Sequence, residues 1–143
     1  MSASRIWDSN IWMYLQTDKP IFIDFTGHGC VNCREMEARV WSDPRVLEIL
    51  KNEYVVVALY VDEKTKLPEE DWYVSEYDGK TKKTMGKQNA DYQIRKFTNN
   101  AQPFYVLMDH KEKVLTKPTA YDLEVNNFVA FLKSGVKKYK GKG

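Results

Sequence analysis

The two cysteines of this chain, Cys30 and Cys33, are separated by only two residues in the stretch F-T-G-H-G-C-V-N-C-R-E-M-E, residues 25–37. A disulfide between them closes almost the smallest loop available, and the stabilisation that a disulfide gives grows with the size of its loop. Such a pair does little for stability. We therefore interpret the two cysteines as a redox pair, with a redox-silent structural pair as the alternative.

The cysteines stand where an apolar run, residues 21–25, gives way to a predicted helix that begins near Cys30. A helix N-terminus offers unpaired N–H groups and the positive end of the helix dipole, and both stabilise a thiolate. In C-x-x-C motifs the thiol pKa falls from about 8.5 to between about 3.5 and 7.5. We predict that Cys30 is exposed and attacks a partner's disulfide, and that Cys33 resolves the mixed disulfide.

Zinc is the other chemistry that a C-x-x-C pair can indicate, and a structural zinc site normally needs four protein ligands. Besides the two cysteines the chain offers only His28 and His110, with no second C-x-x-C and no paired-histidine motif. We therefore predict no bound metal, and no cofactor other than the redox-active Cys30–Cys33 disulfide itself.

Three further polar residues surround the pair in the sequence. Asp24 interrupts an apolar strand, where burial of a carboxylate favours a raised pKa and a role in proton transfer, unless the strand end is wet and Asp24 merely hydrogen-bonded. Glu37 lies one helical turn beyond Cys33 and faces either the same pocket or solvent. His28, when protonated, would stabilise the Cys30 thiolate, although a histidine between two glycines is more often simply exposed.

The composition indicates one soluble globular domain over residues 1–143. Of these residues 43% are hydrophobic and 13% aromatic, which excludes a disordered chain, and the net charge of +2 gives no argument for nucleic-acid binding. Lysines gather in residues 136–143, which we predict to be a solvated basic tail after a helix. No apolar run approaches the roughly 18 residues of a membrane span, and the N-terminus has no signal-peptide core.

Strands separated by helices follow one another along the chain. The apolar patterns predict strands over residues 21–25, 54–61, 103–108 and 113–116, and helices over residues 9–15, 30–40, 44–51 and 90–97 and from about residue 122. This order predicts an α/β fold, a mixed sheet covered by helices on both faces. Residues 63–88 do not fit that plan, and the Asp78–Gly79 pair indicates a two-residue turn, so we predict an inserted hairpin or flap there.

The stretch I-F-I-D-F-T-G-H-G-C-V-N-C resembles the active-site strand and helix of the thioredoxin superfamily. The longer run C-V-N-C-R-E-M-E-A-R-V-W-S-D-P-R-V is similar to the C-terminal, periplasmic thioredoxin-like domain of the DsbD family. The segment Q-P-F-Y-V-L-M-D resembles the strand that the cis-proline of these proteins opens, which would be Pro103. The resemblance covers residues 19 to about 132 and implies a thioredoxin-like fold.

The resemblance implies a protein-disulfide reductase that works in an electron relay. A membrane-embedded thiol donor would recharge the dithiol, which would then reduce protein disulfides of exported proteins in the periplasm; the chain would be an excised soluble domain, and we expect a monomer. Asp24 and Glu37 carry over as site residues, and the bond between Gln102 and Pro103 is predicted to be cis, so that the Gln102 backbone can pair with an incoming peptide. Gly29 stands where family members commonly carry tryptophan, which bears on the choice of partner.

Two other functions remain open at this stage. A net oxidase or isomerase would use the same fold, but the C-V-N-C motif lacks the Gly-Pro and Gly-His middles of thioredoxins and disulfide isomerases. A non-catalytic binding module would use the fold as a scaffold and the inserted flap as its grip.

Overall fold

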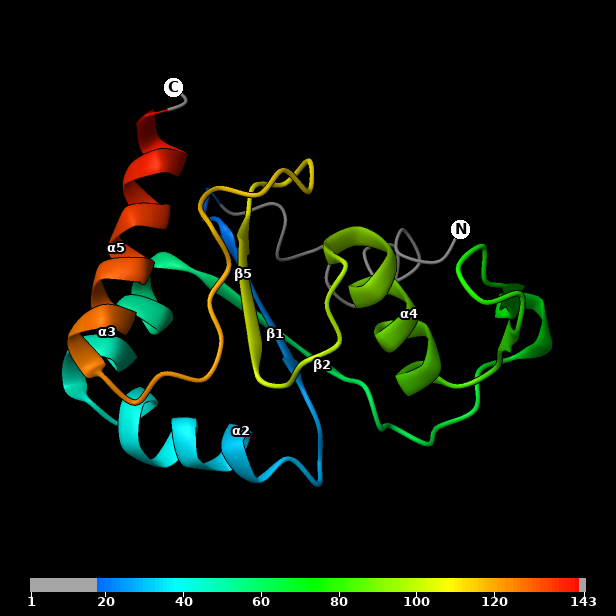
Figure 1. Cartoon of the computed structure of the whole chain (residues 1–143). Helices are drawn as coiled ribbons and strands as arrows, with labels where there is room; N and C mark the ends of the chain where they lie inside the picture. Colours follow the sequence, from blue (N-terminus) through cyan, green and yellow to red (C-terminus); the bar gives the residue numbers. More distant parts are fainter. Residues whose placement is uncertain (1–17, 142–143) are drawn as a thin grey trace.

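A three-stranded mixed sheet forms the centre of the protein, for which a computed structural model describes residues 18–141 (Figure 1). Strand β1 (Ile21–Thr26) lies between β2 (Val55–Tyr60), to which it is parallel, and β5 (Phe104–Met108), to which it is antiparallel. The helix predicted over residues 9–15 lies outside the described residues. The mixed sheet and the position of its three strands confirm the predicted α/β architecture.

Every residue of β1 is buried, which explains why the strand reads as a continuous apolar run. Successive side chains of a strand point to opposite faces, so a strand covered on both faces needs apolar residues at every position. Asp24 breaks this rule and shares its face of the sheet with Phe22, two residues earlier.

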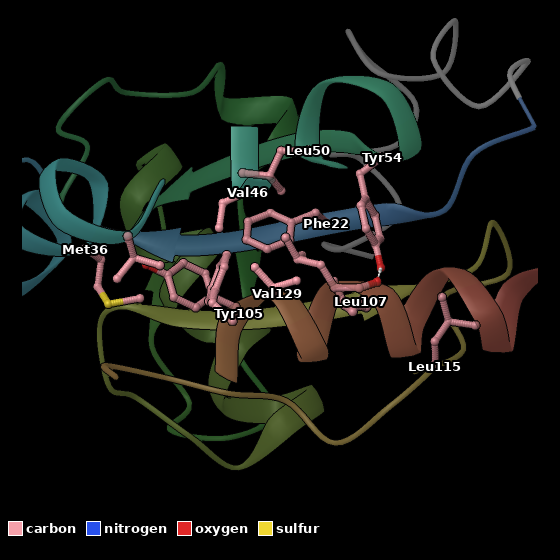
Figure 2. Packing of buried hydrophobic residues seen from close by; sticks show 12 residues of the cluster. Phe22, Met36, Val46, Leu50, Tyr54, Tyr105, Leu107, Leu115 and Val129 are labelled. Carbon is pink, nitrogen blue, oxygen red and sulfur yellow. Dashed lines mark hydrogen bonds between the residues drawn. The ribbon is translucent and has the colours of Figure 1, made fainter. Parts of the chain in front are cut away.

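The face of the sheet that carries Phe22 packs against four helical segments, as the close view of the core shows (Figure 2). These are α2 (Val31–Met36), η2 (Glu37–Trp41), α3 (Pro44–Glu53) and α5 (Val125–Gly141). The Phe22 ring stacks on Tyr105 with 5.4 Å between ring centroids and meets the Phe128 ring edge-on at 6.1 Å. Helix α2 is thereby fixed on the sheet through Met36, which is fully buried in the same cluster.

The opposite face of the sheet is covered by α4 (Met85–Phe97), which Figure 1 shows on the other side of the strands from α3 and α5. The side chains of Ile23 and Phe25 enter this second cluster together with Tyr92 of α4 and Val106 of β5. Helices therefore cover both faces of the sheet, as the sequence predicted.

Several predicted boundaries are wrong by part of an element. The helix predicted over residues 30–40 ends its α-helical part at Met36 and continues as the π-helical turn η2. Helix α4 begins at Met85 rather than at residue 90, and α5 runs to Gly141, so the lysines assigned to a solvated tail from residue 136 are helical up to that point. Residues 113–116 form no regular strand but meet β5 through an isolated bridge between Met108 and Val114.

The inserted hairpin is present, but its turn is longer than predicted. Strands β3 (Tyr73–Val74) and β4 (Thr81–Lys82) pair through Val74 and Thr81, so residues 75–80 connect them rather than Asp78–Gly79 alone. A short 3₁₀ turn, η3 (Glu69–Asp71), precedes the hairpin.

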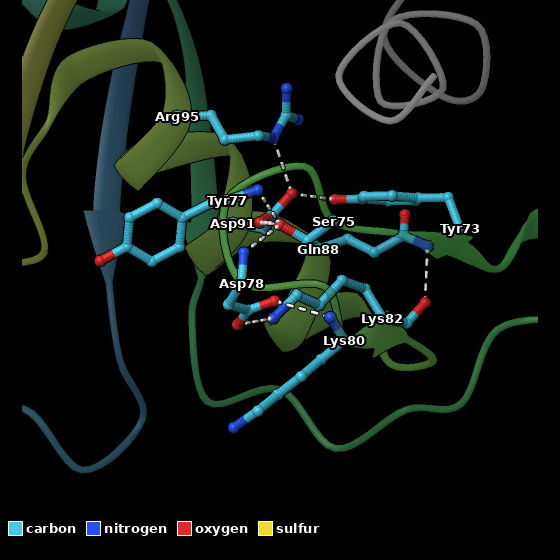
Figure 3. Close-up of polar contacts among 9 residues, drawn as sticks. All are labelled: Tyr73, Ser75, Tyr77, Asp78, Lys80, Lys82, Gln88, Asp91 and Arg95. Atoms are coloured by element: carbon cyan, nitrogen blue, oxygen red, sulfur yellow. Dashed lines mark hydrogen bonds and ion pairs between the residues drawn. The ribbon is translucent and has the colours of Figure 1, made fainter.

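Figure 3 shows how the hairpin is anchored to α4 through the buried carboxylate of Asp91. The hydroxyl groups of Tyr73 and Ser75 in the hairpin both donate hydrogen bonds to this carboxylate, and the bond from Tyr73 is 2.8 Å long. From within α4, the Arg95 guanidinium donates to the same carboxylate at 2.7 Å. The insertion is therefore fastened to the main body by a buried polar cluster.

Candidate active site

The two cysteines form a disulfide at the N-terminus of α2. Cys30 is the N-cap residue, and its Sγ accepts a hydrogen bond from the backbone N–H of Cys33 at 3.1 Å. Cys33 is only 1% exposed, whereas Cys30 is half-buried and so remains accessible. This arrangement gives one accessible and one buried sulfur atom, with the accessible one at the positive end of the helix dipole.

The loop between β1 and α2 brings the chain to this position. β1 ends at Thr26, the chain turns through Gly27–Gly29, and the backbone N–H of Cys30 donates to the carbonyl oxygen of Gly27 at 3.2 Å. The carbonyl oxygen of Cys30 then accepts the first helical hydrogen bond, from Arg34, at 3.2 Å. The sulfur chemistry is thus placed at the edge of the sheet where β1 ends.

Pro103 lies at this same edge of the sheet. In the antiparallel register of β1 and β5, Phe25 faces Phe104, so the residue before Phe104 is level with the end of β1. The Gln102–Pro103 peptide bond is cis, as predicted. The side-chain amide of Gln102 donates to Oε1 of Gln93 at 3.0 Å and to the carbonyl oxygen of Asn100 at 3.1 Å.

Asp24 is buried within β1, with 4% of its surface exposed, and its Oδ1 has no hydrogen-bond partner among the described residues. Burial raises the pKa of this carboxyl to about 7, and the negative charge of Glu37 adds to the shift while the Arg34 cation opposes it. The carboxyl group therefore exchanges its proton near neutral pH.

Glu37 lies nearer the surface than Asp24. Its side chain is 37% exposed and pairs with Arg34 at 3.3 Å. Both carboxyl groups line a pocket of about 430 Å³ formed by residues of β1, η2, α3 and β2, whose other lining residues are Trp41, Ser42, Leu47, Val56, Ala58 and Tyr60. This pocket connects the buried Asp24 to the surface.

The His28 side chain contacts the last residue of β2 and a residue that follows this strand. Its ring stacks on Tyr60 with 4.1 Å between centroids, and its Nε2 lies 2.8 Å from Oε1 of Glu63. The His28 side chain is 57% exposed, and its ring nitrogen Nε2 is taken up by Glu63 rather than by Cys30. The structure therefore places the imidazole against Glu63 and Tyr60.

Asp62 is a site residue that sequence reasoning missed. Its carboxylate accepts hydrogen bonds from the backbone N–H groups of His28 at 2.8 Å and Gly29 at 3.1 Å. The available signal was its position directly after β2, because the carboxyl ends of adjacent parallel strands meet at one edge of a sheet, where sites of α/β proteins form.

Residues 18–141 contain no group of three or more histidine, cysteine, aspartate and glutamate side chains placed to hold a metal ion. Among the helices in the same range, none combines the length and the apolar character needed to cross a membrane.

The chain was compared with families of known proteins. A family model described as thioredoxin-like matches residues 7–110. Comparison with curated protein sequences gave no significant match.

Solved structures share the fold at low sequence identity. A protein named DsbH oxidoreductase has a TM-score of 0.62 and 20% identity over 87% of this chain and 78% of its own. A thioredoxin from Thermus thermophilus has a TM-score of 0.59 and 17% identity, covering 89% of this chain and 81% of its own. The reduced C-terminal domain of DsbD from Neisseria meningitidis has a TM-score of 0.58 and 13% identity, covering 94% and 97%.

Proposed function

Because the chain belongs to the thioredoxin-like family, we propose that it is a thiol:disulfide oxidoreductase that acts as a reductase of protein disulfides. The observation that carries this proposal is the Cys30–Cys33 disulfide at the N-terminus of α2, with the first sulfur accessible and the second buried. A disulfide that closes so short a loop would add almost nothing to stability. Thiol–disulfide exchange, in contrast, needs one accessible sulfur atom to attack the partner and a second one to resolve the mixed disulfide.

The reaction begins from the reduced dithiol. The Cys30 thiolate attacks one sulfur of the partner's disulfide, forming a mixed disulfide and releasing the first partner sulfur as a thiolate, which takes up a proton. Cys33 then loses its proton and attacks Sγ of Cys30, which releases the second partner sulfur. Two electrons and two protons pass to the partner, and the Cys30–Cys33 disulfide is the oxidised product.

Asp24 is suited to accept the proton that Cys33 must lose. Its carboxyl group is buried, as Cys33 is, and its pKa of about 7 lets it take up and release a proton near neutral pH. The pocket that it shares with Glu37 offers a route for that proton to solvent. Glu37, partly exposed, would assist this exchange rather than contact the sulfur atoms.

The edge of the sheet beside Cys30 would bind the partner. In this proposal an extended segment of the partner pairs with the Gln102 backbone beside Pro103 and passes over Gly29, which leaves the space that a larger residue would fill. The partner contributes main-chain hydrogen bonds at this edge, and its disulfide meets Cys30.

The proposed direction of electron flow is toward the partner. The resemblance of the C-V-N-C-R-E-M-E stretch to the DsbD family motivates a relay in which a membrane-embedded thiol donor reduces this domain, and the domain, as a monomer in the periplasm, reduces disulfides of exported proteins. The solved DsbD and DsbH structures support the shared fold. A net oxidase of the same fold would differ in its reduction potential.

Insulin reduction by dithiothreitol tests the proposal. The wild-type protein should accelerate the precipitation of the insulin B chain, and Cys30→Ser should abolish the acceleration. The reduction potential of the Cys30–Cys33 pair is measured by equilibration with glutathione buffers. A value near −270 mV would fit a reductant such as thioredoxin, and one near −120 mV would fit an oxidant such as DsbA. A wild-type protein without any acceleration would leave the fold as a binding scaffold.

A further inference from the structure

Two side chains of opposite charge hold the loop that leads to Cys30. From α2, Nη2 of Arg34 donates to Oγ1 of Thr26 at 2.9 Å and to the carbonyl oxygen of Gly27 at 3.2 Å. From the end of β2, the Asp62 carboxylate accepts the N–H groups of His28 and Gly29. The cation therefore binds the acceptors of the loop, and the anion binds its donors.

The Asp62 carboxylate is committed to this loop. Its two oxygens bond two successive backbone N–H groups, and the hydrogen bond from His28 is the main reason why the pKa of Asp62 lies below its usual value. A Cβ atom at Gly27 would lie 3.2 Å from Oδ2, so the absence of a side chain there leaves room for the carboxylate. Asp62 is thus charged whenever the thiols titrate.

We propose that Asp62 is a positioning residue for Cys30: it fixes the loop that sets Cys30 at the N-cap of α2, and its negative charge restrains formation of the Cys30 thiolate. This inference rests on the proposed function in taking Cys30 as the nucleophile. Asp62 bonds the residue immediately before Cys30, and consecutive Cα atoms are about 3.8 Å apart, so the carboxylate lies within roughly 10 Å of the sulfur.

The balance of charge around Cys30 gives the sign of the effect. On the side of β2, Asp62 and Glu63 are acidic, and Glu63 is paired with His28. On the side of α2, the Arg34 cation is paired with Glu37, and beneath the helix Asp24 is neutral below a pH of about 7. A unit charge at such a distance near the surface shifts the equilibrium between thiol and thiolate by a small factor, in the direction set by its sign.

The experiment measures the pH dependence of Cys30 alkylation by iodoacetamide in a Cys33→Ser background, where Cys30 is the one remaining thiol. Asp62→Asn removes the charge but keeps one acceptor oxygen. Its alkylation midpoint should move to lower pH, with the rate below the midpoint rising about threefold. Arg34→Gln should move the midpoint in the opposite direction by a similar factor.

Asp78→Asn is the matched control. Asp78 also accepts a backbone N–H, that of Lys80 at 2.9 Å, but it lies in the β3–β4 hairpin (Figure 3). This variant should leave the midpoint unchanged. Because Asp62 is exposed, the difference between wild type and Asp62→Asn should also shrink in 1 M salt, where the Debye length is about 3 Å.

Superimposed profiles for wild type and Asp62→Asn would overturn the inference, as would an equal shift in Asp78→Asn. If Asp62→Asn does not fold, the alkylation profile of Arg34→Gln decides. A midpoint at higher pH than in the wild type supports control of the thiolate by the charges that hold this loop, and an unchanged midpoint refutes it. Alkylation needs no partner protein, so a wild-type chain that fails to reduce insulin refutes the proposed function without affecting this measurement.

Discussion

Asp24 and Glu37 line the same pocket, and the charge of Glu37 adds to burial in raising the pKa of Asp24 to about 7. The ordinary pKa of the aspartate, 3.8, applies to the unfolded chain. The folded protein therefore binds one more proton than the unfolded chain between these two values, and its stability falls as the pH rises through this window. Above pH 7 the full cost of the buried charge is present.

Asp24→Asn should remove that cost. The variant should exceed the wild type in free energy of unfolding by something on the order of 3–4 kcal/mol at pH 8, and the gain should vanish toward pH 4. Urea unfolding of the oxidised proteins at several pH values measures the difference. A gain that does not depend on pH would mean that the Asp24 carboxylate is not the group responsible.

The proton-transfer role of Asp24 predicts a kinetic cost for the same substitution. Since asparagine cannot accept the proton of Cys33, Asp24→Asn should slow resolution of the mixed disulfide by a factor on the order of 10². The rate is obtained by quenching the reaction with acid at successive times and measuring the amount of mixed disulfide that remains. Wild-type resolution in the variant would assign the proton to water instead.

The order of the nucleophiles follows from their exposure. Reduced Cys30 should react with iodoacetamide well before Cys33 at neutral pH, because Cys33 is 1% exposed. Cys33→Ser should accumulate a stable mixed disulfide with a protein substrate, whereas Cys30→Ser should form none. Equal labelling of both thiols would contradict the assignment.

Local patterns in the sequence were enough to predict the sheet and the helix that Cys30 caps, and they favoured a buried Asp24 over one at a wet strand end. Each of these rests on neighbours within one strand or one turn of helix. Asp62 was missed because its contact with His28 spans 34 residues and exists only once β1 and β2 pair in parallel. The fold class was therefore readable from short-range periodicity, while the clamp on the active-site loop depends on strand pairing.

The length of the hairpin turn has a similar explanation. The Asp78–Gly79 pair favours a two-residue turn, but Ser75 is drawn into the bond with Asp91, 16 residues away in α4. That tertiary contact lies directly after β3, so turn propensity alone predicted a turn that is too short.

We therefore expect Asp91 to stabilise the packing of the β3–β4 hairpin on α4. Asp91→Ala removes a buried acceptor of two hydroxyl groups and of Arg95, and it should lower the free energy of unfolding by roughly 2–4 kcal/mol. Hydrogen exchange should accelerate at the Gly79 amide, which bonds the carbonyl oxygen of Ser75 within the turn. Unchanged protection at Gly79 would show that the hairpin is held by other contacts.

Gly86 joins the insertion to the main body, and it has no room for a side chain. A Cβ atom there would lie 2.6 Å from the backbone N and O of Glu63 and 2.7 Å from the carbonyl oxygen of Val61. Backbone atoms cannot move aside as a side-chain tip can, so Gly86→Ala should push α4 away from the end of β2 and lower the free energy of unfolding by about 1–3 kcal/mol.

Gly141→Ala, at the end of α5, is the control. A Cβ atom there meets nothing within 4 Å, so this substitution should be neutral or slightly stabilising. Thermal unfolding of both variants checks the prediction, and a Gly86→Ala protein as stable as Gly141→Ala would show that α4 is not packed so closely against this strand end.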